Sequence, residues 1–211
     1  MNKIIKQPCL RILFAFTSFF LLTSTSFAYL SLSETGELIK EDHYRIGVIP
    51  QLLLNNGGGT NVGVFFDMPV ETDMNSRFVI GGGNTDFYTS ASVKWVPYPD
   101  FQKQPAIGLR ASFIYARAVN VNSYDIQITP IISKIITTQW GKLNPYVGLP
   151  ITMINNSSRS VTAMQFAVGS EWIERADFQV GGELDLNLQN TTTALTFHVN
   201  FPFDGTTGFR Q

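Results

Sequence analysis

The sequence predicts an all-β fold, an up-and-down antiparallel transmembrane β-barrel of about ten strands. Apolar and polar residues alternate along most of the chain, which is typical of strands whose two faces meet different surroundings. Charged residues make up only 15% of the 211 residues, well below the roughly one quarter usual in soluble domains. The chain also opens with an export signal. These three observations favour a membrane barrel, with about eight strands as the alternative count.

Residues 1–28 are expected to be a cleaved signal peptide. The segment begins with a positive region formed by Lys3, Lys6 and Arg11. An apolar run follows within residues 12–27, and residues 26–28 (Ser-Phe-Ala) form a small-x-small site, so we expect cleavage after Ala28. The single cysteine, Cys9, leaves with the signal, so the mature chain is expected to have no disulfide.

The mature chain is expected to form one domain. Residues 29–43 are polar and predict a leader ahead of the first strand, residues 44–203 predict the barrel, and residues 204–211 predict a C-terminal tail. Turns rich in Gly, Asn, Ser and Thr separate the strands. The expected strands cover residues 44–54, 61–70, 77–82, 87–97, 106–119, 124–137, 143–154, 161–172, 178–188 and 195–203.

The first five strands are predicted from their alternation and from the turns between them. In the second strand, for example, Val64 and Phe66 face one way, whereas Phe65 and Asp67 face the other. The third strand is short and ends in three glycines. If it merged with the fourth strand across the following turn, the count would fall to about nine strands. A longer connection with two prolines precedes the fifth strand.

The last five strands include the most regular segment of the chain. The sixth strand alternates clearly at first and less clearly over residues 131–136. The seventh and eighth strands are separated by the polar turn NNSSRS. The ninth and tenth strands form a hairpin in which Leu184 and Leu186 share the apolar face, while Glu183 and Asp185 share the polar face.

The composition of the polar face favours a lumen over a water-exposed surface. This face is rich in Gly, Ser, Asn, Gln and Thr, and its few charges have both signs. A soluble lipocalin-like barrel would place apolar residues inside and charged residues outside. The residues predicted to form a polar network in the lumen are Arg45, Asp67, Lys94, Arg110, Glu183, Asp185 and His198.

The tryptophans predict an aromatic girdle at one end of the barrel. Numbered along the chain, the odd turns are small and polar, whereas all three tryptophans lie near even turns. Aromatic residues gather at the interfaces of membrane barrels. The predicted girdle consists of Trp95, Tyr98, Trp140, Trp172, Phe178, Phe201 and Phe203.

The export signal, the alternating strands and the aromatic final strand LTFHVNFPF resemble those of small outer-membrane β-barrel proteins of Gram-negative bacteria. The resemblance covers essentially all of residues 44–203. It implies an outer-membrane location, both termini in the periplasm, contact with outer-membrane lipid, and contact with the assembly machinery during insertion. Such proteins usually end on a terminal Phe, whereas Phe203 is followed here by residues 204–211.

The sequence predicts a non-enzymatic barrel with a structural or narrow-pore role. The chain has two histidines, His43 and His198, and His198 would face Glu183 and Asp185 on the adjacent strand. No serine stands in a motif that would complete a hydrolase triad, so we expect a satisfied hydrogen-bond network, with no catalytic residue, no metal site and no cofactor. The lumen charges could line a pore or fill it.

Two other functions stay open at this point. One is a soluble periplasmic or secreted lipocalin-like barrel that binds a lipophilic ligand. The other is a barrel lipid hydrolase that uses His198. The nearly balanced charge, with 15 basic and 16 acidic residues, argues against a nucleic-acid partner.

Overall fold

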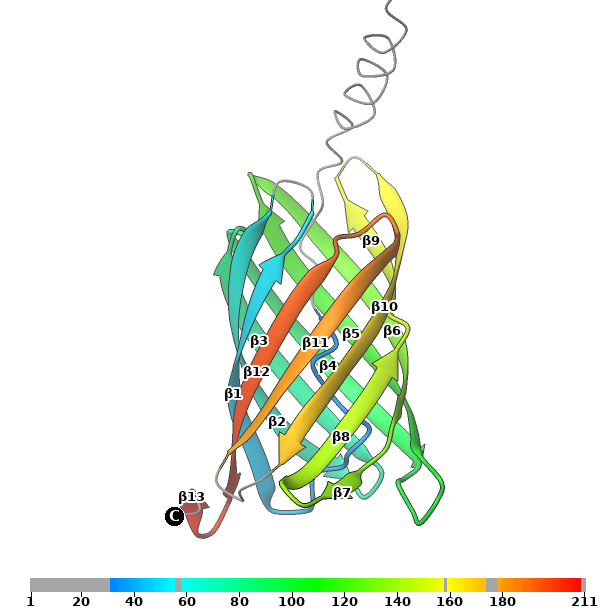
Figure 1. Cartoon of the computed structure of the whole chain (residues 1–211). Helices are drawn as coiled ribbons and strands as arrows, with labels where there is room; N and C mark the ends of the chain where they lie inside the picture. The colour runs from blue at the N-terminus through cyan, green and yellow to red at the C-terminus, as the bar shows by residue number, and fades with distance from the viewer. Residues whose placement is uncertain (1–30, 56–57, 158, 174–177, 210–211) are drawn as a thin grey trace, which may run out of the picture.

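A computed structural model describes residues 31–55, 58–157, 159–173 and 178–209, and the predicted signal peptide lies outside these ranges. Its strands surround a lumen that contains the N-terminal part of the described chain (Figure 1). Among the described residues, no helix is long and apolar enough to cross a membrane. The strands are β1 (His43–Leu53), β2 (Gly59–Glu71), β3 (Met74–Gly83), β4 (Phe87–Tyr98), β5 (Ala106–Ala118), β6 (Val121–Ser133), β7 (Ile136–Thr138), β8 (Gly141–Gly148), β9 (Ile151–Asn156), β10 (Ser160–Ile173), β11 (Gln179–Gln189), β12 (Ala194–Asp204) and β13 (Gly208–Phe209).

The sheet is antiparallel and closes on itself. From β1 to β6 and from β9 to β12 each strand pairs with the next, and β12 pairs with β1 from His43↔Asp204 to Leu53↔Ala194. Because the first and last long strands are joined, the long strands of the described chain form a closed ring with no open edge between them.

The barrel has ten strand positions, as predicted. Both β8 and β9 lie between β6 and β10, so they share one position that is interrupted at Leu149 and Pro150. Proline has no backbone N–H to donate to a neighbouring strand, which accounts for the break. The short β7 follows β6 and pairs with β8, and β13 folds back on β12 at the end of the chain.

The outer surface is apolar and the inner surface is polar. On β5, Ile107, Leu109 and Phe113 are 40–52% exposed, whereas Arg110 and Ser112 are buried. The same alternation continues on β11 and β12, where Leu186 and Phe197 point outward. This distribution is the reverse of a soluble ligand-binding barrel, so the lipocalin-like alternative is wrong.

Aromatic side chains gather near both ends of the outer surface. At the end where β12 finishes, Tyr44 stacks against both Phe66 and Phe203, and Phe209 of β13 packs on Phe203 with its ring centre 5.0 Å away. At the opposite end, Tyr115 packs between Phe87 and Tyr124, with ring centres 6.2 and 5.3 Å away. Of these aromatic residues, only Phe203 belongs to the girdle predicted from the sequence.

Several inward-facing rings lie close to glycines of neighbouring strands. A Cβ atom on Gly81 would stand 2.4 Å from the Tyr88 ring, and one on Gly63 would stand 2.6 Å from the Tyr88 hydroxyl. Gly63 and Gly81 are paired across β2 and β3, and Tyr88 is the partner of Gly81 on β4. Because Gly63 and Gly81 have no side chains, the Tyr88 ring can occupy the space above them.

The apolar outer surface predicts a strong penalty for charge near its middle. Replacing Ile128, which is half exposed on β6, by Arg should lower the free energy of unfolding in lipid vesicles by about 2–4 kcal/mol. Urea titration followed by tryptophan fluorescence measures the change. Val119→Arg is the control, because Val119 lies in a turn and is 84% exposed. Equal effects of the two substitutions would contradict the assignment of the lipid-facing surface.

Candidate pore and its plug

The N-terminal segment of the described chain lies inside the barrel. Residues 31–39, which we call the plug, form no helix or strand and run through the lumen before the chain turns into β1 (Figure 1). The exposure of residues 31–35 is at most 9%. The sequence predicted a leader here but gave no indication that it would fill the barrel.

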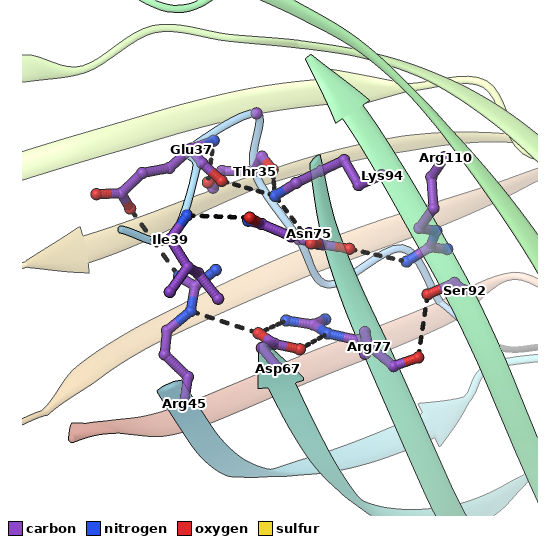
Figure 2. Close-up of polar contacts among 12 residues, drawn as sticks. Thr35, Glu37, Ile39, Arg45, Asp67, Asn75, Arg77, Ser92, Lys94 and Arg110 are labelled. Atoms are coloured by element: carbon purple, nitrogen blue, oxygen red, sulfur yellow. Dashed lines mark hydrogen bonds and ion pairs between the residues drawn. The ribbon is translucent and has the colours of Figure 1, made fainter. Parts of the chain in front are cut away.

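Three basic residues on adjacent strands bind the backbone of the plug. Arg77 on β3 donates to the Ser33 carbonyl at 2.8 Å, and Arg110 on β5 donates to the Leu32 carbonyl at 2.7 Å. Lys94 on β4 donates to the carbonyls of Thr35 and Glu37 at 2.8 and 2.7 Å (Figure 2). These bonds satisfy carbonyl groups of a segment that has no regular structure of its own.

The acidic side chains of the plug pair with the same wall. The Glu34 carboxylate lies 2.8 Å from Lys94 Nζ and 3.6 Å from Arg110 Nη1. Glu37 lies 4.0 Å from Arg45 on β1. The side chains of Glu34, Arg45, Lys94 and Arg110 are at most 7% exposed, whereas that of Glu37 is more exposed. Water therefore screens the ion pairs of Glu34 only weakly.

The plug also reaches the opposite wall. The Ser33 N–H donates to Glu183 on β11 at 2.8 Å, while the Ser33 carbonyl accepts from Arg77 on β3. Ser33 is therefore held between two strands that are far apart in the strand order. Its φ of 41° is uncommon for a residue other than glycine, and these two contacts hold it there. The Gly36 N–H donates to Ser133 and the Ile39 N–H to Asn75, at 3.0 and 3.3 Å.

A second charge group belongs to the wall alone. Arg77 donates two hydrogen bonds to Asp67, at 2.6 and 2.8 Å, and Arg45 lies 3.4 Å from the same carboxylate (Figure 2). The three residues are direct partners across β1, β2 and β3, with Asp67 in the middle. The Arg77 guanidinium also lies 4.2 Å from the ring centre of Phe65, in cation–π geometry.

His198 pairs with a different carboxylate from the predicted ones. Its Nε2 lies 3.5 Å from Glu171 on β10, and Asn200 donates to the same Glu171 at 2.7 Å. Glu183 and Asp185, the expected partners, lie on β11 between these two strands, but the intervening residue opposite His198 is Gly181. Because Gly181 has no side chain, the His198 ring extends across it to the next strand.

Little space remains in the lumen beside the described part of the plug. Beside Leu32 there remains a cavity of about 20 Å³, lined by polar residues that include Ser92, Ser112 and Gln127, which is room for about one water molecule. A wider hollow of about 260 Å³ lies where the plug joins β1, lined by Lys40, Arg45 and other residues. The space beside Leu32 is thus much smaller than the hollow where the plug joins β1.

All seven residues predicted for the lumen network are at most 6% exposed in the interior. The structure brings Arg45 together with Asp67, and Lys94 together with Arg110, but these pairs depend on Arg77 and Glu34. Neither Arg77 nor Glu34 is among the lumen residues predicted from the sequence. The alternation of β3 predicts that Arg77 faces the lumen, whereas no local sequence pattern predicts that Glu34 lies there.

The predicted girdle residues lie at or beside the last residues of β4, β10 and β12 and the first residues of β8 and β11, which in an antiparallel sheet share one end of the barrel. Trp95 donates to Asp73 at 2.8 Å, and Trp172 donates to the Trp140 carbonyl at 2.9 Å. Tyr98 and Phe201 are exposed, and Phe178 and Phe203 are partly exposed. Indole and phenol groups that combine an apolar body with a polar edge suit a membrane interface.

Comparison with known proteins shows the fold. No family model and no curated protein matches the sequence. An outer membrane channel from Pseudomonas putida F1 is similar in structure, with a TM-score of 0.51 and 10% identity over 83% of this chain and 100% of the channel. The β domain of the Bordetella autotransporter BrkA gives a TM-score of 0.48 and 9% identity over 77% of this chain and 98% of that domain. The chain has the fold of an outer-membrane β-barrel, and the predicted fold class is confirmed.

Two adjacent glycines on β11 provide a matched test of the His198 contact. A Cβ atom on Gly181 would stand 2.2 Å from the His198 ring and 2.9 Å from a backbone oxygen, whereas one on Gly182 meets nothing nearer than 3.6 Å. Gly181→Ala should therefore lower the free energy of unfolding by about 1–3 kcal/mol, and Gly182→Ala should leave it nearly unchanged. Denaturant titration of the refolded barrel measures both. A Gly182→Ala loss as large as that of Gly181→Ala would refute the assigned orientation of β11.

Proposed function

We propose that the protein is a non-enzymatic outer-membrane barrel whose lumen is a narrow pore, closed by its own N-terminal plug. The observation that carries the proposal is the nature of the contact between plug and wall. Most of the contacts described above are hydrogen bonds and ion pairs, and Leu32 is the plug's fully buried apolar side chain. Water that enters the lumen can replace such polar contacts when the plug leaves.

The barrel does not need the plug to stay closed as a sheet. The pairing of β1 with β12 consists of backbone contacts between residues 43–53 and 194–204, all outside the plug. Withdrawal of residues 31–39 would therefore open the lumen without breaking the strand ladder. Because the pairing of the wall strands does not depend on the plug, a pore is favoured over a purely structural barrel.

The location follows from the export signal and the outer surface. We propose that residues 1–28 are removed on export, that the assembly machinery inserts the barrel, and that outer-membrane lipid contacts the apolar surface. The end with the C-terminus would face the periplasm. The wider hollow, where the plug joins β1, opens at that end.

The surroundings of His198 support a non-enzymatic role. In a hydrolase triad one ring nitrogen of the histidine contacts a carboxylate and the other contacts the nucleophile. Here Nε2 faces Glu171, and Nδ1 is buried without a hydrogen-bond partner. Among the described residues, no serine or threonine hydroxyl therefore bonds to Nδ1 to form a proton relay.

Removal of the plug should produce a conducting pore. A mature chain that begins at residue 40 is expected to show stepwise conductance in planar bilayers, whereas the mature chain that begins at residue 29 should be nearly silent. The control is a chain that lacks residues 205–211 and keeps the plug, which should stay silent. Equal conductance of the chains with and without the plug would rule out the proposed closure.

Ester turnover tests the enzymatic alternative directly. The refolded barrel should not hydrolyse a chromogenic fatty-acyl ester above the rate of vesicles alone, and His198→Ala should not change that rate. Turnover that disappears in the His198→Ala variant would instead establish a barrel hydrolase.

A further inference from the structure

We propose that the lumen binds small zwitterions of about dipeptide size, and that Ser33 and Glu34 of the plug occupy this binding site in the closed barrel. The inference rests on the proposed function, because a solute reaches the site only after the plug has left it. The site consists of a basic group and an acidic group on opposite walls of the lumen. Each group lacks an oppositely charged partner on its own wall.

The basic group is Lys94 and Arg110. These residues are direct partners across β4 and β5, where two like charges repel one another. The neighbouring row is different, because Asp67 stands between Arg45 and Arg77 and forms an ion pair with each of them from within the wall. Within the described part of the chain, Lys94 and Arg110 form ion pairs only with Glu34 of the plug. When the plug leaves, these two buried cations require another anion.

The acidic group is Glu183 and Asp185. They lie two residues apart on the inner face of β11 and are at most 1% exposed. Neither residue has a cationic side chain within 4.0 Å among the residues described. Glu183 accepts a hydrogen bond from the Ser33 N–H. In the closed barrel this wall therefore accepts a hydrogen bond from the plug backbone. A solute with a cationic group could donate to the same carboxylates.

Consecutive residues of the plug satisfy both groups. The Ser33 N–H points to Glu183, and the carboxylate of Glu34 lies between Lys94 and Arg110. A dipeptide with a free N-terminal ammonium and an acidic second residue would place a nitrogen donor and a carboxylate at the same separation along its chain as Ser33 and Glu34 do. Its ammonium would bind Glu183 more strongly than an amide N–H does, because both partners are charged.

The surroundings of the site limit the solute in size and chemistry. Hydroxyl and amide groups of Ser90, Ser92, Ser112 and Gln127 line the small cavity next to the plug and can bind the polar backbone of a peptide. A simple anion would compensate the basic group and leave the acidic group without a partner. A simple amine would do the reverse. A zwitterion is the one small solute that compensates both walls.

Titration calorimetry on the chain without residues 31–39 tests the site. We expect the dipeptide Gly-Glu to bind, and N-acetyl-Gly-Glu, which has no ammonium group, to bind about tenfold more weakly or not at all. Lys94→Gln and Arg110→Gln should each weaken Gly-Glu binding by about tenfold. Arg117→Gln is the matched control, because Arg117 is exposed near the end of β5.

Each outcome decides the inference. Equal affinity for Gly-Glu and N-acetyl-Gly-Glu would overturn it and leave a plain carboxylate site, and absence of Gly-Glu binding would overturn it altogether. If this chain conducts but does not bind the dipeptide, the pore stands and the zwitterion site falls. If it binds the dipeptide but does not conduct, the site stands and the pore falls.

A second measurement uses the intact mature chain. Gly-Glu should displace the plug and raise the conductance, and N-acetyl-Gly-Glu should not. Glu34→Gln removes the carboxylate that the solute must replace, so this variant should respond at lower dipeptide concentration. A conductance that does not change with Gly-Glu in either chain would overturn the inference, even if the chain without residues 31–39 does not refold.

Discussion

The requirement that every backbone group in hydrocarbon has a hydrogen-bond partner governs this structure. The ladder between β1 and β12 meets it by closing the sheet, and the alternation of side chains then sends one face of every strand outward and the other inward. A ring of ten strands leaves only a narrow interior. Polar side chains from all sides must therefore share a small space, and their charges must balance there.

The balance of charges in the lumen is partly local and partly long-range. Asp67 lies between Arg45 and Arg77 and pairs with both through the wall itself, in a row fixed by strand register. The row that contains Lys94 and Arg110 has no such acid, and Glu34 supplies it from outside the sheet. The plug is thus a component of the charge balance and not only a filling.

The sequence predicted the wall well because the wall is periodic. Alternation identified all ten strand positions and the face on which Arg110, Glu183 and His198 lie, since each depends on residues one or two positions away. The position of the plug depends on contacts such as that between Ser33 and Glu183, which are 150 residues apart. The pairing of His198 with Glu171 also escaped prediction, because it crosses Gly181 and skips one strand.

The short connection between the plug and β1 has a consequence for how strongly a solute must bind. Residues 40–42 alone separate the last plug residue from the first residue of the sheet, so a displaced plug stays tethered beside its own site. For a tether of this length the effective local concentration of the plug is in the millimolar range. Any free competitor works against that concentration, which makes the barrel responsive to abundant solutes and insensitive to traces. Reclosure is intramolecular and needs no second molecule.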